Sequence, residues 1–197
     1  VMALKPLHDK FDLVSITPVA YQAVSGSGTA ALSSLSKEES LDDKSLAELK
    51  DGYYTRPIAR NVIPLAGNLL DNGYSDEEMK FVHESKKILG IPELVVEPSN
   101  ARVGVRTGHG VFCSAVFVKN INTDEAIDEL NNFEGVQYWS ETLATPLDAE
   151  NNYDVLVSRL RIGLSSPKII NFWCVSDNLL KGAALNAVQI AKYLIQK

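Results

Sequence analysis

The sequence has 197 residues, of which 45% are hydrophobic, and a formal net charge of −6 at pH 7. This length and apolar content are enough to bury a core. The negative charge argues against a nucleic acid or a membrane surface as the partner, and no apolar run approaches the roughly 20 residues that a membrane-spanning helix needs. These properties leave a soluble globular protein.

The chain begins with VMALKPLHDKF, whose apolar side chains have helical spacing but follow no N-terminal cap. Because Pro6 interrupts this pattern early, the sequence predicts a short or kinked helix. Because this predicted helix has no N-terminal cap of its own, it indicates the continuation of a longer chain. We therefore expect the chain to be a fragment.

A β-branched, apolar stretch at 13–22, LVSITPVAYQ, predicts a strand that runs into the glycine-rich turn SGSG. The polar segment 29–52 that follows has helical parts and is typical of a surface excursion. A second helix begins after Ser75, because Ser75 and Glu78 form a capping box. This helix ends at Gly90.

Strand patterns dominate the second half of the chain, and helices are inserted between them. We expect strands at ELVVEP, ARVGVRT, VFCSAVFVK (111–119), GVQYW, DVLVSRLRI (154–162) and IINFWCVSD (169–177), with helices at 122–133 and 178–197. The strand at 111–119 is apolar on both alternating faces, which predicts a central strand covered on both sides. This order predicts an α+β fold, with a mostly antiparallel mixed sheet and flanking helices.

The strand expected at 154–162 alternates neatly between apolar and other residues. In a regular strand, alternate side chains share one face of the sheet. The pattern therefore predicts one face formed by Val155, Val157, Arg159 and Arg161.

The stretch RVGVRTGHG, residues 102–110, carries unusual polar chemistry for a strand. A buried arginine is costly unless it is paired, and the planar guanidinium of Arg102 suits a carboxylate or a phosphate. His109, between two glycines, could titrate near neutral pH at a ligand site. On an unbroken strand, however, Arg102 and His109 face opposite sides. The residues alone leave a shared site and an ordinary sheet edge followed by a turn equally open.

Two further stretches have both a functional and an ordinary interpretation. The backbone of SGSG, from Ser25, could point N–H groups at an anion if a helix begins at Thr29; a plain tight turn is the commoner structure. Glu84 and Lys87 share one helix face, where a solvent-exposed ion pair is the ordinary explanation.

The two cysteines, Cys113 and Cys174, both lie inside apolar runs. That placement predicts buried free thiols in a reducing compartment rather than a disulfide or a metal site. We therefore expect a cytoplasmic protein that binds no metal.

Several motifs, taken together and in this order, resemble the C-terminal part of aspartate-semialdehyde dehydrogenase: YQAVSGSG, DNGYSDEEMK, HESKKILG, RVGVRTGHG and SDNLLKGAALNAVQIA. The segment 33–55 is the weakest part of the match. The resemblance implies a fold similar to the C-terminal domain of glyceraldehyde-3-phosphate dehydrogenase. It also implies that residues 1–176 form a substrate-binding and dimerisation domain, and that 177–197 form a helix that packs on an NADP-binding domain.

The resemblance implies an oxidoreductase of amino-acid biosynthesis, on the route to lysine, threonine and methionine. In this reaction NADPH reduces β-aspartyl phosphate to aspartate semialdehyde, and phosphate is released. A cysteine thiolate attacks the acyl group, a thioester forms, and hydride from NADPH reduces it. The implied assembly is a homodimer or a tetramer.

The resemblance also assigns roles around the substrate. Arg102 matches the arginine that grips the α-carboxylate, and His109 matches the general acid–base. Gln22 matches the glutamine that orients the acyl group. Glu84 would pair with the substrate ammonium, and Lys87 would help to hold the phosphate.

On the cofactor side, the resemblance assigns three residues. Ser25 and Gly26 match residues that line the cofactor side of the site, and Asn178 matches a contact beside the nicotinamide. If Arg102 and His109 share one site, the chain must leave strand geometry between them. Gly104 and Gly108 can allow such a break, which we expect near residues 106–108.

The sequence also departs from the family pattern. The nucleophile motif Asn-Cys-Ser/Thr-Thr and the glycine fingerprint GxGxxG are both absent, and neither Cys113 nor Cys174 lies in such a motif. The chain alone is therefore expected to be inactive. A smaller departure is Ser27, where the family often has Ala.

Two other functions stay open. A related acyl-phosphate reductase could act on N-acetylglutamyl phosphate, although the carboxylate expected at Glu84 would then have no ammonium to bind. A non-catalytic dimerisation module is the second, but such a module has no physical reason to keep buried charges such as Arg102.

Overall fold

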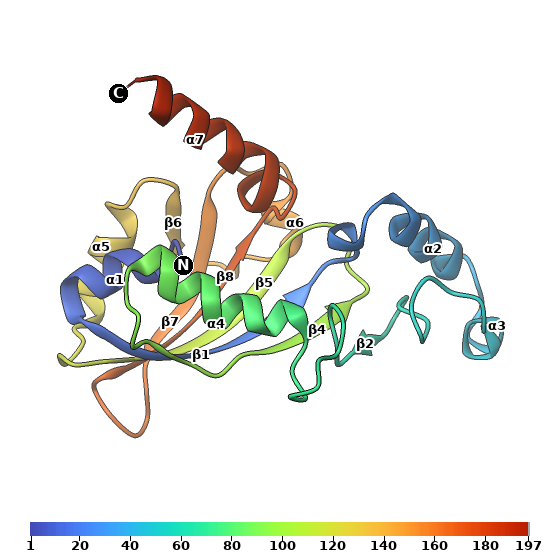
Figure 1. The fold of residues 1–197 in the computed structure, drawn as a ribbon, viewed down its shortest axis with the longest axis horizontal. Coiled ribbons are helices and arrows are strands. Elements are labelled where there is room, and N and C mark those ends of the chain that lie inside the picture. Colours follow the sequence, from blue (N-terminus) through green and yellow to red (C-terminus); the bar gives the residue numbers. More distant parts are fainter. Residues whose placement is uncertain (197) are drawn as a thin grey trace.

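A mixed sheet runs through the molecule, and its long central strands are β1, β5, β8 and β7 (Figure 1). The computed structural model describes residues 1–196. The sheet is eight-stranded, in the order β2-β4-β1-β5-β8-β7-β6, and β3 pairs with β1 beside β4. The strands are β1 (Leu13–Gln22), β2 (Val62–Ile63), β3 (Val95–Val96), β4 (Ser99–Val103), β5 (His109–Phe117), β6 (Val136–Trp139), β7 (Val155–Ile162) and β8 (Ile169–Ser176). Antiparallel pairs slightly outnumber parallel ones, which confirms the predicted α+β class.

Helices are inserted between the strands. They are α1 (Leu4–Phe11), the 3-10 turn η1 (Val24–Ser27), α2 (Thr29–Glu39), α3 (Asp43–Glu48), α4 (Asp76–Leu89), α5 (Thr123–Asn131), α6 (Pro146–Ala149), the π-type turn η2 (Leu180–Ala184) and α7 (Leu185–Ile195). The predicted capping box of α4 is present, because Ser75 and Glu78 bond reciprocally, and Gly90 ends the helix at φ 71°. No helix among residues 1–196 is long and apolar enough to cross a membrane.

Helices α1, α4 and α5 cover one face of the sheet and form the main core with it (Figure 1). Leu7 of α1 and Leu130 of α5 are buried there against Phe117 and Phe172 of the central strands. Burial of such side chains contributes about 1.5–3 kcal/mol each. This core holds together elements that are far apart in the sequence.

The opposite face of the sheet is covered only in part. Tyr21, Phe112 and Trp173 form an aromatic cluster on it, with ring centroids 4.7 to 6.2 Å apart. These three side chains are half-buried, and α6 packs beside them at one end of the strands. Strand β5 is therefore central, as predicted, but it is not fully covered on its second face.

The alternation predicted along residues 154–162 is interrupted by a β-bulge. The register of β7 on β8 shifts between Ser158 and Arg161, and Arg159 has a φ of 56°. After the bulge, Leu160 takes the core face that Val157 occupies before it. Arg159 instead lies over the Phe112 ring on the other face, 5.8 Å from its centroid. The expected single face was wrong because an extra residue in a strand reverses its sides.

Residues 24–63, which we name the flap, form a second and smaller cluster beyond the edge of the sheet (Figure 1). Leu35 and Ile58 are fully buried within it. The Glu38 carboxylate is also buried and accepts hydrogen bonds from the backbone N–H groups of Ile58 and Ala59 at 2.6 and 2.9 Å. The polar surface excursion predicted for 29–52 therefore has a core of its own.

Helix α7 projects away from the sheet (Figure 1). None of its described side chains is buried, and Leu194 and Ile195 are exposed. Asp177, at the base of this segment, is buried and its carboxylate accepts hydrogen bonds from the N–H groups of Leu179 and Leu180. The division into 1–176 and 177–197, with the second part packing on another domain, stays a prediction.

Candidate functional site

Three of the predicted residues lie in one row across three neighbouring strands. Gln22 ends β1, and its register partner on the parallel strand β4 is Arg102. Tyr21 pairs with Gly110 on the other side, so His109 at the start of β5 lies beside Gln22. Because β4 and β5 flank β1 and run in opposite directions, the chain between them turns around the end of β1. The turn brings Arg102 and His109 to the same edge.

The expected break between the two strands is present, over residues 104–108. Gly108 has a φ of 95°, which favours glycine. Gly104 has a different reason: a Cβ there would lie 2.6 Å from the carbonyl oxygen of Ile58 in the flap. Gly108 therefore allows the turn, and Gly104 allows the flap to pack on the end of β4.

Gly26 lies in the gap between the Arg102 and His109 side chains. A Cβ built on Gly26 would lie 3.1 Å from His109 Nε2 and 3.3 Å from Arg102 Nη1. Both side chains therefore approach the same backbone position of η1. A side chain at residue 26 would push against both.

The His109 imidazole is oriented by the backbone. Its Nδ1 accepts a hydrogen bond from the N–H of Ala23 at 3.1 Å, so in the neutral ring the proton is on Nε2. Burial, and then the charge of Arg102, lower the pKa of His109 from 6.5 to about 4. The ring is therefore neutral at pH 7 and presents an N–H donor from Nε2.

The Arg102 guanidinium is buried, and its hydrogen bonds are incomplete. Its Nη1 donates to the carbonyl oxygen of Ala23 at 2.7 Å, whereas Nε is buried without a partner among the described residues. Burial lowers the pKa of Arg102, although an arginine stays charged at any ordinary pH. A buried donor without a partner costs about 1–3 kcal/mol, which a bound anion would offset.

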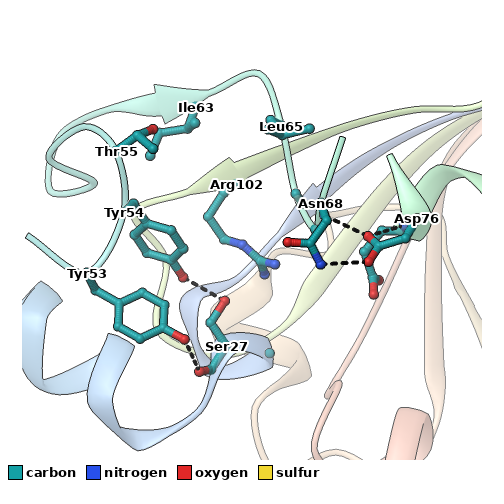
Figure 2. Close-up of a pocket in the computed structure, with 13 residues that line it drawn as sticks. Ser27, Tyr53, Tyr54, Thr55, Ile63, Leu65, Asn68, Asp76 and Arg102 are labelled. Atoms are coloured by element: carbon teal, nitrogen blue, oxygen red, sulfur yellow. Dashed lines mark hydrogen bonds between the residues drawn. The ribbon is translucent and has the colours of Figure 1, made fainter. Parts of the chain in front are cut away.

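Arg102 lines a cavity of about 470 Å³ between the flap and the start of α4 (Figure 2). On the flap side the wall is formed by Ser27, Tyr53 and Tyr54, and on the opposite side by Asp76 and Glu77. The cavity therefore has a cation on one wall and carboxylates on another. This is the charge pattern that a small zwitterion requires.

Glu77 is a cavity residue that the sequence analysis did not identify. It accepts a hydrogen bond from Gln22 Nε2 at 3.3 Å and forms an ion pair with Lys80 on the same helix. This bond to Glu77 raises the pKa of Lys80. Glu77 therefore joins the row that Gln22 forms with Arg102.

Glu84 and Lys87 lie away from the Arg102 cavity, and their predicted roles stay predictions. Both side chains are exposed on α4, and neither lines a cavity beside Arg102 or His109. Glu84 lies two helical turns beyond Glu77, about 10 Å along the helix axis. Only the first turn of α4 faces the end of β1.

The residues predicted for the cofactor side form a contact of their own. Asn178 Oδ1 accepts hydrogen bonds from the Gly108 N–H at 2.9 Å and from Ser25 Oγ at 3.1 Å. Asn178 thus holds η1 and the residue that precedes His109. His109 lines a second cavity, of about 200 Å³, together with Val1 and Ser176. Arg102 and Gly26 line the first cavity, whereas His109 lines the second.

The two cysteines are free, as expected. Cys113 is buried and Cys174 is half-buried, and burial raises the pKa of Cys113 to about 12. A thiol with so high a pKa is a poor nucleophile. Among residues 1–196, no three His, Cys, Asp or Glu side chains are grouped to hold a metal ion.

The fold and the site together define a class: an α+β domain with a charged cavity near a neutral histidine. Residues 4–181 match the family described as semialdehyde dehydrogenase, dimerisation domain. The chain belongs to this family.

Curated relatives and solved structures support the same family assignment. The chain is 42% identical to aspartate-semialdehyde dehydrogenase from Corynebacterium glutamicum, an alignment that covers 98% of this chain and 60% of the relative. It is 35% identical to the Bacillus subtilis enzyme, over 98% of this chain and 59% of that protein. The chain thus spans about three-fifths of the length of these relatives.

The crystal structure of aspartate semialdehyde dehydrogenase II from Vibrio cholerae superposes with a TM-score of 0.94 at 36% identity, over 100% of this chain and 59% of that one. The same protein complexed with ASA superposes with a TM-score of 0.90 over 99% and 58% of the two chains. The enzyme with NADP from Candida albicans, at 23% identity over 98% and 53% of the two chains, has a TM-score of 0.71.

Proposed function

We propose that this chain is the substrate-binding and dimerisation part of an aspartate-semialdehyde dehydrogenase. In the whole enzyme, NADPH would reduce β-aspartyl phosphate to aspartate semialdehyde with release of phosphate. The observation that carries the proposal is the convergence of Arg102, Gln22, Glu77 and His109 at one edge of the sheet. A C. glutamicum relative of that name, 42% identical to this chain, supports it.

The charges of the larger cavity suit an α-amino acid. Arg102 would hold the α-carboxylate through donors that its single bond to Ala23 leaves available. Glu77 would face the ammonium, and Gln22, which donates to Glu77, would fix the direction of that carboxylate. Glu77 thereby takes the role that the sequence analysis gave to Glu84.

His109 would act on the other side of the substrate. Its neutral ring offers the Nε2 proton at pH 7, because the pKa is lowered to about 4. A donor at that position can stabilise the oxyanion that develops on the acyl oxygen and can protonate it. Gly26 leaves space for this approach, since any larger residue would press on Nε2.

Two components would come from the part of the relatives that this chain does not span. One is the attacking thiol, since Cys113 and Cys174 lie in the sheet and burial raises the pKa of both. The other is most of the NADP site, since the phosphate-binding glycine fingerprint is absent. The cofactor supplies hydride when it is bound. From this chain, Ser25, Gly26 and Asn178 would contact its nicotinamide end, at the edge that Asn178 already braces.

Dimerisation would use the open face of the sheet. Tyr21, Phe112 and Trp173 present a half-buried aromatic cluster there, and aromatic side chains are enriched at interfaces. The description of the family as a dimerisation domain supports this use. Free thiols support a reducing, cytoplasmic location for the enzyme.

The competing reductase of an acetylated substrate is less well supported. Glu77 lines the cavity and would face an amide rather than an ammonium, which leaves a carboxylate without a cation from the substrate. A non-catalytic module would have no use for a buried Arg102 with an unpaired Nε.

The direct test is the phosphate-dependent oxidation of L-aspartate semialdehyde by NADP⁺ in the intact enzyme. His109→Gln should lower kcat by roughly 10²–10⁴-fold. Arg102→Lys should lower kcat/KM by roughly 100-fold, because an ammonium cannot replace the planar fork. Arg106→Lys, at an exposed arginine of the same loop, is the matched control. Full activity of His109→Gln would contradict the proposed function.

The 197-residue chain by itself should show no NADPH-dependent turnover, because neither of its cysteines is suited to attack. The measurement is absorbance loss of NADPH with β-aspartyl phosphate. Turnover that survives replacement of both Cys113 and Cys174 would contradict the mechanism.

A further inference from the structure

Two hydroxyl-bearing residues of the flap, Ser27 and Tyr54, lie next to each other in the structure. The Tyr54 hydroxyl donates a hydrogen bond to Ser27 Oγ at 2.9 Å. Both residues line the Arg102 cavity (Figure 2). An Ala at position 27 could not accept this bond, so the contact requires both hydroxyl groups.

The pair leaves one proton available for a ligand. A serine hydroxyl has one donor and two acceptor positions, and Ser27 uses an acceptor position for Tyr54. No described residue accepts the Ser27 hydroxyl proton. Tyr53 contributes differently, because its hydroxyl donates to the backbone oxygen of Ser27 at 3.1 Å. Tyr54 is therefore the phenol that directs the Ser27 hydroxyl.

The Tyr54 side chain and the Arg102 guanidinium line the same cavity. Figure 2 shows the Tyr54 ring beside Arg102, with its hydroxyl directed at Ser27. An anion bound to Arg102 would thus lie in the cavity that the Ser27 hydroxyl also lines.

We propose that Tyr54 and Ser27 form a hydroxyl relay that adds a donor to the α-carboxylate held by Arg102. Ser27 contacts the substrate carboxylate, and Tyr54 is a positioning residue that acts through Ser27. The pair makes the site more selective for substrates that carry an α-carboxylate. This inference rests on the proposed function and identifies further residues of the same site.

The test compares two aldehydes in the intact enzyme. L-Aspartate semialdehyde carries the α-carboxylate, and 3-aminopropanal is the same molecule without it. Ser27→Ala and Tyr54→Phe should each raise KM for L-aspartate semialdehyde about tenfold while kcat stays within about twofold. Neither variant should change kcat/KM for 3-aminopropanal. The double variant should match either single variant, because both remove one relay.

Tyr74→Phe is the control, since Tyr74 lies outside the cavity and its hydroxyl donates to Glu97. Unchanged KM values in both variants would overturn the relay, as would equal losses on both aldehydes or additive losses in the double variant. Ser27→Ala removes only a hydroxyl group, which keeps the test interpretable if Tyr54→Phe fails to fold. A wild-type enzyme that does not oxidise L-aspartate semialdehyde would instead refute the proposed function.

Discussion

The sheet and the flap differ in how they are stabilised. The main core joins α1, α4, α5 and the central strands, so residues from the whole chain contribute to it. The flap core draws almost entirely on residues 24–63, with Leu65 packed against it, and a buried carboxylate, Glu38, fixes its backbone. The floor of the site therefore depends on apolar packing between distant parts of the chain, whereas its roof depends on a small local core and on the Glu38 carboxylate within it.

The largest effect is expected in the main core. Phe117→Ala should lower the free energy of unfolding by about 3–5 kcal/mol, because Phe117 is 1% exposed and truncation leaves a cavity. Chemical denaturation followed by circular dichroism measures this loss. Val118→Ala, at the exposed neighbour, should cost less than about 0.5 kcal/mol. Equal losses at the two positions would mean that the core does not govern the stability of the sheet.

A smaller and more local effect is expected in the flap. Glu38→Leu removes the acceptor of the Ile58 and Ala59 N–H groups, which should cost the flap about 2–3 kcal/mol. Hydrogen exchange should accelerate at those two amides and stay slow in β5. Glu39→Gln, next along the helix and half-exposed, should leave both unchanged. Acceleration in β5 would show that flap and sheet unfold as one unit.

The smallest effect is expected at His109, where the flap meets the sheet, and it concerns the pH dependence of stability. The pKa of His109 falls from 6.5 to about 4 through burial first and Arg102 second. The unfolded chain binds this proton more readily, so stability should decrease as pH falls from 6.5 to 4, by about 2 kcal/mol. Denaturation across this range, in the chain and in His109→Gln, isolates the contribution. A profile that is identical in the variant would contradict the half-buried, neutral ring.

Much of the sheet side could be predicted from the sequence, because its signals are local. The capping box at Ser75 and the glycine at residue 90 define α4, and the β-branched run defines β1. The glycines at 104 and 108 indicated the break that lets Arg102 meet His109. In each case the local pattern and the tertiary structure require the same conformation.

The remaining features depend on packing that no local pattern contains. Helix α4 carries two Glu–Lys pairs at the same spacing, Glu77 with Lys80 and Glu84 with Lys87, and only the direction in which the helix meets β1 separates them. The bulge at Arg159 is likewise set by pairing with β8. Sequence periodicity could therefore predict neither which Glu–Lys pair lies near the end of β1 nor where the alternation of β7 is interrupted.

The anchoring of the last helix has a mechanical consequence. Asp177 fixes the start of that helix through two backbone N–H groups and also accepts the N–H of Asn151, while the next residue, Asn178, grips Gly108. The exposed helix that follows is thus tied, through Asn178, to the residue that precedes His109. A displacement of the start of this helix would be transmitted to the backbone beside the imidazole.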